Sequence, residues 1–363
     1  EICACLVGSE MCIRDSPPTV RSSNFELLRI FCMLSIVAVH YVWHGGSAAS
    51  GSNIAAAYFL GNFAQIGVAC FVLIGAWFLI DKEFSITRIF NLSKQITFYS
   101  LSIALLLFII GMASYTDIIK NAMPIIFKRY WFLTPYVFLL FLHPFLNYVL
   151  NACSKKQIRF LCISLFIAVS VIPTIFIVTD PFGFNIFRFI LLYLIAYAIK
   201  KECIRIEFKN NLLNFITSIT VAFGMYSLSL LALRWNYTDF ASLYPKQMSS
   251  VPVMISSVYL FLGIKHLTFK SNFINKLSAH TLAVYLISEH TCLFKWFWTD
   301  ILRTDKLWNA GIFEYLGYSS LIILSVFVSC ILIDYIIKNT IYKILPNTPK
   351  FLINIEHYFK IKT

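Results

Sequence analysis

Residues 26–43 read ELLRIFCMLSIVAVHYVW, an apolar stretch long enough to cross a bilayer as a helix. Within it, Arg29 and His40 are eleven residues apart. At about 100° per residue, eleven steps return a helix to within roughly 20° of its starting direction. The two side chains therefore share a face, about 16 Å apart along the helix axis. A titratable group at membrane depth is costly, so His40 is the first candidate for a functional residue.

The composition of the whole chain indicates a membrane protein. Of its 363 residues, 59% are hydrophobic and only 13% are charged, whereas soluble domains carry about 25% charged residues. We therefore expect an all-α polytopic membrane protein. Apolar runs of about 17–25 residues predict about ten transmembrane helices, at 27–44, 57–80, 96–113, 131–150, 158–178, 186–199, 212–233, 251–266, 279–298 and 318–337.

Basic residues are unevenly distributed over the loops that connect these predicted spans. Alternating the loops between two sides puts 20 Lys and Arg on the side of both termini and 8 on the other, with Arg29 and Arg188 inside spans. The positive-inside rule then predicts that the N- and C-termini are cytoplasmic. The net charge of +13 is thus mainly a topology signal, with anionic lipid or cofactor phosphate as secondary interpretations. We do not expect nucleic-acid binding.

The chain divides into one large domain with short ends. Residues 1–20 lack the regions of a signal peptide, and the string CLVGSEMCIRDS resembles a translated sequencing adapter, so we expect a non-native leader there. Residues 21–345 form one transmembrane domain, and 346–363 form a short basic cytoplasmic tail. The ten cysteines contain no CxxC pattern and are expected to be reduced, buried hydrophobes. No His, Cys or carboxylate cluster has metal-ligand spacing, so we expect no metal.

Six sequence blocks occur in an order that points to one family. NFELLRIFCMLSIVAVHYVWHGG carries Arg29 and His40 in an Arg/Lys-x10-His pattern, and it is followed by IGVACFVLIGAWFLI, FSITRIFNLSKQITFYS, YWFLTPYVFLLFLHPFLN, FRFILLYLIAYAIK and LSAHTLAVYLISEH. Together they resemble membrane-bound acyltransferase family 3, and most of all its branch that acts on surface polysaccharides. The second block departs from the usual FVLISGYFL, and Ser288 stands where many members carry His.

The resemblance implies an integral membrane O-acyltransferase of a bacterial cytoplasmic membrane. It would move an acetyl group from cytoplasmic acetyl-CoA to a hydroxyl of a surface or exported polysaccharide. Such a reaction needs a base for the hydroxyl proton, and a neutral imidazole suits this role. We assign it to His40, with an acyl-His relay as the alternative. Glu289 lies at comparable depth in the span 279–298, and we expect it to face His40 and orient the imidazole.

Arg29, Arg88 and Lys94 are the residues that we expect to contact the phosphates of acetyl-CoA. Arginine carries a permanent charge and a planar fork that suit phosphate, and Arg29 lies near the cytoplasmic end of its span. Each residue also has a simpler interpretation. Arg29 can snorkel to lipid headgroups, and the other two can be topology-setting charges. Glu26, three residues before Arg29, either holds it in place or is an interfacial charge.

Several polar residues and two other functions remain open at this point. His44, His143 and His290 are expected to be interfacial or structural rather than catalytic, and Arg188 and Trp308 are minor candidates for contact with the acceptor. The expected partners are membrane lipids and a polysaccharide or lipid-linked sugar acceptor, with no prediction of oligomeric state.

The alternative function is a multi-span transporter or flippase of a lipid-linked sugar, although transporters commonly show two similar halves and paired broken helices. A polysaccharide polymerase is a second rival, for which the outer loops are short.

Overall fold

The computed structural model describes residues 22–46, 52–176, 186–237 and 247–358, and over this part of the chain it contains helices and no strand. The expected leader at 1–20 lies outside the described residues. The helical elements are α2 (Ser23–His40), η2 (Tyr41–Gly46), α3 (Ser52–Asn62), α4 (Ala64–Leu79), α5 (Ile86–Ile109), α6 (Tyr115–Ala122), α7 (Leu133–Ala152), α8 (Lys155–Phe166), η3 (Ile167–Val171), α9 (Ile172–Ile175), α10 (Ile186–Lys200), α11 (Asn211–Arg234), α13 (Val251–Lys265), α14 (Asn272–Ser278), α15 (Thr281–Ser288), α16 (Phe294–Trp296), η4 (Phe297–Ile301), η5 (Thr304–Leu307), α17 (Ile312–Asn339), η6 (Ile341–Ile344) and α18 (Lys350–Tyr358).

The predicted all-α fold is confirmed, and so is the presence of several helices that can cross a membrane. Within the described ranges, seven segments are long and apolar enough to do so, and α13 is apolar but shorter. The number of about ten spans is therefore confirmed only in part. The seven segments are Ser23–Gly45, Asn53–Leu79, Ile86–Ile109, Leu133–Ala152, Lys155–Ile175, Asn211–Arg234 and Ile312–Asn339.

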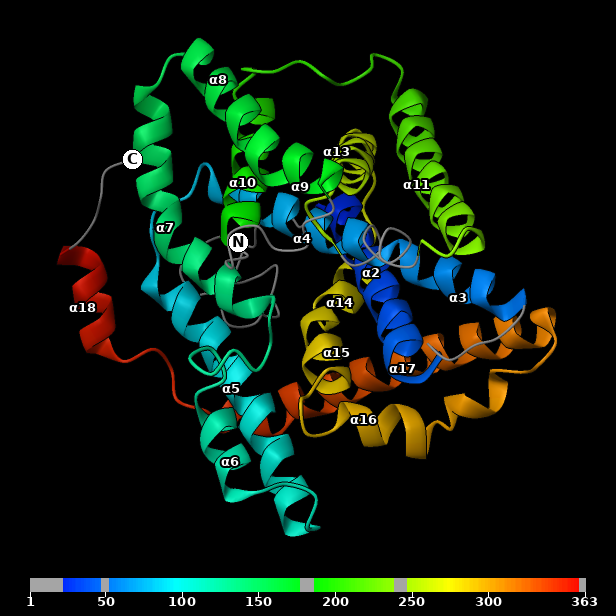
Figure 1. Ribbon diagram of the computed structural model, residues 1–363. Helices are drawn as coiled ribbons and strands as arrows, with labels where there is room; N and C mark the ends of the chain where they lie inside the picture. Colours follow the sequence, from blue (N-terminus) through cyan, green and yellow to red (C-terminus); the bar gives the residue numbers. More distant parts are fainter. Residues whose placement is uncertain (1–21, 47–51, 177–185, 238–246, 359–363) are drawn as a thin grey trace.

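The helix that carries Arg29 and His40 lies in the middle of the molecule. In the most apolar windows of the first two spanning segments, 78% and 83% of the residues are buried, against 28% in both Lys155–Ile175 and Asn211–Arg234. Figure 1 shows α2 and α4 at the centre, with α8 and α11 at the periphery. Helix α2 packs against α4, α14 and α15. The polar residues of α2 are therefore enclosed by protein and not by lipid.

The prediction of one continuous span at 279–298 is wrong. Helix α15 ends at Ser288, and the short α16 begins only at Phe294. His290 explains the break, because its ring bonds to groups outside the helix: Nε2 lies 2.9 Å from the carbonyl oxygen of Ser100 in α5, and Nδ1 accepts the backbone N–H of Cys292 at 3.3 Å. Apolar composition cannot reveal such a break, since the segment stays largely apolar on both sides of it.

His143 satisfies a backbone group that a proline leaves without a partner. Pro144 lies inside α7 and has no N–H, so the carbonyl of Leu140, one turn earlier, loses its helical hydrogen bond. Nδ1 of His143 lies 2.8 Å from that carbonyl oxygen. An unpaired carbonyl at membrane depth is costly, which accounts for a buried histidine here. The structural interpretation of His143 is therefore the one that its contacts favour.

The buried carboxylate of Asp334, near the C-terminal end of α17, joins three helical segments. Asp334 has no exposed surface. One of its oxygens accepts a hydrogen bond from the hydroxyl of Tyr99 in α5 at 2.5 Å. The other oxygen lies 2.6 Å from Nδ1 of His280 and 2.8 Å from Nζ of Lys338. A buried charge requires such pairing, so this cluster fixes α5 and α17 against the start of α15.

The predicted tail contains a helix that lies against α5. The Glu356 carboxylate of α18 accepts the backbone N–H groups of Ile86 and Thr87 at 2.9 and 3.3 Å. These N–H groups belong to the first turn of α5 and have no partner within their own helix. The carboxylate also complements the positive end of the helix dipole.

Helix α4 packs closely against α2 at Gly67, and a side chain at this position would disturb that contact. A Cβ atom at this position would lie 3.0 Å from the Cys32 carbonyl oxygen and 3.1 Å from its Cα atom. Gly67→Val must therefore push the two central helices apart, at a cost of about 1–3 kcal/mol. We expect a clearly lower midpoint of thermal unfolding in detergent. Gly224→Val is the matched control, because nothing lies within 4 Å of a Cβ there. Equal loss in both variants would contradict the close packing of α2 and α4.

Candidate active site

The side chains of His40, His44 and Glu289 meet where α2 and α15 end. Nδ1 of His40 lies 3.0 Å from Oε1 of Glu289, and Nε2 of His44 lies 3.3 Å from Oε2. The side chain of Glu289 is 14% exposed. The predicted juxtaposition of Glu289 and His40 is thus present, while their catalytic roles remain predictions. The sequence predicts His44 at the interface, and the structure also brings it to Glu289. Its spacing of one helical turn from His40 was the available signal for the contact with Glu289.

The two contacts of Glu289 differ in kind. The contact with His44 has hydrogen-bond geometry. The contact with His40 is close enough for an ion pair, but neither of the two atoms makes a hydrogen bond within the described part of the chain. Hydrogen bonds in free enzymes are often poorly aligned and tighten when substrate binds. Glu289 is therefore held by a hydrogen bond to His44, whereas it faces His40 without one.

The chain after His40 forms a π-helical turn that is fixed from outside. The hydroxyl of Ser319 in α17 donates to the Tyr41 hydroxyl at 2.7 Å, and the Trp308 indole N–H donates to the Gly45 carbonyl at 2.5 Å. A Cβ on Gly45 would lie only 1.9 Å from Oγ1 of Thr304, so this position requires glycine. Trp308, a minor candidate for acceptor contact, therefore supports the turn that carries His44.

A small cavity of about 40 Å³ opens beside His40. Trp43 and Trp131 are its two exposed residues, at 36% and 38%, so the cavity reaches the surface at these tryptophans. This volume accommodates a few heavy atoms. The lining comes from α2, η2, α4, α15 and the two residues just before α7: Met33, Ile36, Val39, His40, Trp43, Ala64, Gln65, Val68, Phe71, Trp131, Phe132, Leu282 and Tyr285.

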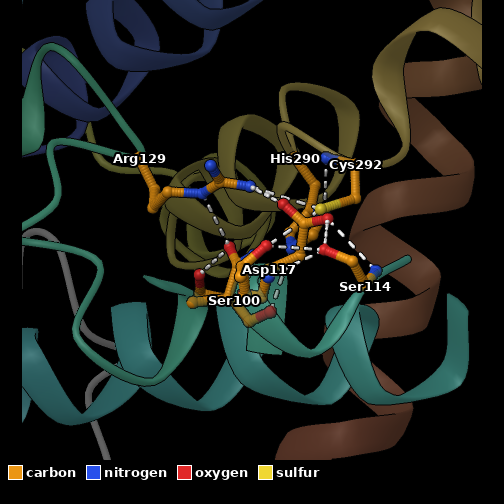
Figure 2. A network of polar contacts seen from close by, with 8 residues as sticks. Ser100, Ser114, Asp117, Arg129, His290 and Cys292 are labelled. Carbon is orange, nitrogen blue, oxygen red and sulfur yellow. Dashed lines mark hydrogen bonds and ion pairs between the residues drawn. The ribbon is translucent and has the colours of Figure 1, made fainter. Parts of the chain in front are cut away.

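A polar network holds the turn that follows Glu289. Figure 2 shows side chains from α5, α6, the segment before α7 and this turn converging on one another. Nη2 of Arg129 lies 3.4 Å from Oδ1 of Asp117 and 3.3 Å from Sγ of Cys292, and its Nε donates to Asn121 at 3.3 Å. The backbone carbonyl of Ser100 contacts His290, and its hydroxyl donates a hydrogen bond to Asn121 at 2.7 Å. This network could not be predicted from sequence patterns, because its members are far apart in the chain.

Asp117 is the charged partner of Arg129 in this network. Hydrogen bonds from the Ser114 side chain and backbone, together with the charge of Arg129, hold the pKa of Asp117 below its usual range, although partial burial acts in the opposite direction. Ser114 and Asp117 also form the capping box at the start of α6. The carboxylate therefore serves both as a helix cap and as the partner of Arg129.

The three predicted phosphate contacts lie in two separate environments. Arg29 is buried, and its Nη1 lies 2.6 Å from Oε1 of Glu26. The other Glu26 oxygen accepts the Ser278 hydroxyl at 2.5 Å, so Glu26 holds Arg29 in place, one of the two interpretations considered. Arg88 and Lys94 lie on α5, where Lys94 donates to the Pro346 carbonyl at 2.9 Å. Their roles toward phosphate remain predictions.

The histidine–carboxylate cluster does not form a recognisable metal centre. Over the described ranges, no group of three or more His, Cys, Asp or Glu side chains is arranged to hold a metal ion. The chemistry that these residues offer is proton transfer and charge stabilisation beside an apolar cavity.

Fold and site together define a helical membrane protein with a buried histidine and a carboxylate beside a small apolar cavity. Residues 22–334 match the family model of the acyltransferase domain, acyltransferase family 3, and the chain belongs to this family. No curated protein and no solved structure matches the chain. His40 and Glu289 both lie within the matched region. The match favours the acyltransferase prediction over the transporter, flippase and polymerase alternatives.

The network around Arg129 predicts how the turn after Glu289 responds to a substitution. Arg129→Gln removes the contact with Cys292 and loosens the turn, so we expect Cys292 to react several-fold faster with a maleimide. Peptide mass spectrometry measures this rate, with buried Cys330 in α17 as internal reference. Arg234→Gln, at the end of α11, is the control variant. An unchanged rate at Cys292 would show that Arg129 does not hold the turn.

Proposed function

We propose that this protein transfers an acetyl group from acetyl-CoA to a hydroxyl of a surface or exported polysaccharide, in the cytoplasmic membrane of a bacterium. The observation that carries the proposal is the position of Glu289 between His40 and His44, beside the cavity, in a chain of the acyltransferase family. The polysaccharide acceptor rests on the resemblance of the sequence blocks to that branch of the family.

His40 acts as the general base in the proposed reaction. Its Nδ1 faces Glu289, which leaves Nε2 to accept the proton of the acceptor hydroxyl. The hydroxyl oxygen then attacks the carbonyl carbon of the thioester, and the imidazolium returns the proton to the departing thiolate. Glu289 stabilises the imidazolium between these two steps. General acid–base catalysis of this kind contributes about 10²–10⁴-fold to the rate.

The cavity supports a short acyl group as the one that is transferred. Its volume of about 40 Å³ has room for a few water-sized groups, since one such group needs roughly 10–15 Å³ of cavity, and this suits the three heavy atoms of an acetyl group better than a long chain. The exposed tryptophans at its opening, Trp43 and Trp131, have faces on which an acceptor sugar can lie. We propose that the acceptor approaches there.

The donor approaches from the opposite, cytoplasmic side in this proposal. Arg29 lies about 16 Å along α2 from His40, and we propose that it contacts the donor phosphates together with Arg88 and Lys94. Buried Arg29 is held by Glu26, which supports a fixed cation at this depth.

We propose ten crossings, with both termini in the cytoplasm. The ten consist of the seven long segments, α10, α13 and the interrupted pair α15 and α16. Contacts between helix ends support this topology: Nζ of Lys200, at the end of α10, lies 2.5 Å from Asp81 after α4 and 5.0 Å from the Trp77 ring. Lys265, at the end of α13, lies 5.7 Å from the same ring. Three helix ends with basic residues thus share one side, as the positive-inside rule requires.

His40→Ala and Glu289→Gln test the proposed function. We expect His40→Ala to stay in the membrane and to lose transfer by at least about 10²-fold, because the proton acceptor is gone. Glu289→Gln should lower kcat and change its pH dependence, since the imidazolium loses its counter-charge. Release of thiol from acetyl-CoA by purified protein with an oligosaccharide acceptor measures both, and NMR of the surface glycan measures acetylation in cells.

The control for these two variants is His266→Ala. This histidine lies after α13 with 42% of its side chain exposed, and its loss should leave the activity unchanged. Normal glycan acetylation in the His40→Ala strain would overturn the mechanism. Full activity with an unchanged pH profile in Glu289→Gln would remove Glu289 from it.

Two substitutions in the cavity wall test whether the acyl group binds there. Val68→Ala enlarges the cavity, and we expect the ratio of kcat/KM for propionyl-CoA over acetyl-CoA to rise about tenfold, the scale of one methylene group in an apolar pocket. Ala64→Val, in the same wall, makes the cavity smaller and should lower this ratio. Both residues are buried in α4. Identical ratios in the two variants and the parent protein would place the acyl group elsewhere.

A further inference from the structure

Gln65 is a buried amide whose oxygen lacks a partner within the protein. It lies in the first turn of α4, only 4% of its surface is exposed, and it lines the same cavity as His40. Its Oε1 atom makes no hydrogen bond within the described ranges. Because an amide can flip, this side chain can present either a donor or an acceptor to the cavity.

Such an amide is unfavourable for folding alone. A buried polar atom without a hydrogen bond costs free energy, and an apolar side chain of the same shape would not. The wall around it is made of apolar and aromatic residues, with Met33, Val68 and Phe71 among them. A buried amide whose oxygen has no partner among these residues therefore points to a ligand that carries a hydrogen-bonding group into the cavity.

We propose that Gln65 is a catalytic residue that donates a hydrogen bond to the carbonyl oxygen of the acyl group. This inference rests on the proposed function, because it requires the acyl thioester to enter the cavity beside His40. The developing oxyanion of an acyl transfer gains most from a donor that is already in place and shielded from water. The amide of Gln65 is shielded from water and lines the cavity, and we propose that its nitrogen is turned toward the acyl oxygen when the thioester is bound.

The proposed acyl transfer conserves atoms and electrons. The acceptor oxygen bonds to the acyl carbon while its proton passes to Nε2 of His40, and the carbonyl electron pair moves onto the acyl oxygen. The side-chain N–H of Gln65 donates to this oxyanion. When the carbonyl reforms, the carbon–sulfur bond breaks and the thiolate takes the proton back from His40. The products are an ester and a free thiol, with no oxidation or reduction.

Gln65→Met tests the proposal by kinetics, since methionine keeps the size of the side chain and removes the donor. We expect kcat with acetyl-CoA to fall about 10²–10³-fold, with little change in KM and in the pH profile, because His40 and Glu289 remain. The midpoint of thermal unfolding should not fall. A kcat within threefold of the parent value would overturn the proposal.

Gln95→Met is the matched control for a buried amide. Gln95 in α5 has no exposed surface, and neither of its side-chain polar atoms has a hydrogen-bond partner in the described part of the chain, but it does not line the cavity. Its variant should keep the parent rate. An equal loss of rate in Gln95→Met would show that any buried amide has this effect and would contradict a specific role for Gln65.

Infrared spectroscopy separates this inference from the proposed function. With acetyl-CoA labelled with ¹³C at the carbonyl and bound to His40→Ala, which cannot turn over, we expect the carbonyl band to shift to lower frequency. The shift should disappear in the double variant His40→Ala, Gln65→Met. The same band in both proteins would overturn the role of Gln65 and leave the proposed function intact. No bound-donor band in either protein would contradict both.

Discussion

The carboxylate of Glu289 is the group on which the arrangement of the site depends. A carboxylate enclosed by protein at membrane depth must be paired, since an unpaired charge there is very costly. Its partners lie one turn apart, His40 at the end of α2 and His44 in the π-helical turn that follows. The end of α15 is therefore fixed to the end of α2. The π-helical turn continues the chain from the end of α2, and the Arg129 network holds the turn that follows α15.

Polar contacts of this kind fix the relative positions of the central helices more specifically than their apolar surfaces do. Lipid tails are as apolar as leucine, so apolar packing alone gives little preference for one arrangement of membrane helices. The buried Asp334 joins α5 and α17, and Glu26 joins Arg29 of α2 to Ser278 at the end of α14. These clusters and the site share one feature: each links residues far apart in the sequence around a carboxylate.

The sequence predicted the fold class, most of the long helices and the facing of His40 and Glu289, because apolar length and helical spacing are local properties. It did not predict the end of α15 at Ser288, which depends on the contact of His290 with Ser100, 190 residues earlier in the chain. Gln65 carried a local signal, a polar residue inside an apolar span, but its lack of a partner is visible only when neighbouring helices are in place. His44 was assigned to the interface, since position along one helix does not reveal what approaches from another.

The unequal contacts of Glu289 give the proposed mechanism a physical basis. His44 makes the hydrogen bond that fixes the carboxylate, while the oxygen that faces His40 has no hydrogen bond in the described structure. Neutral His40 therefore gains little from Glu289 before the reaction. In the proposed reaction His40 takes the acceptor proton, and its positive charge then lies 3.0 Å from this oxygen, where the attraction is strong at low dielectric. An interaction that strengthens only as charge develops lowers the barrier without tightening the ground state. In this arrangement His44 maintains the geometry, and His40 is free to change its charge.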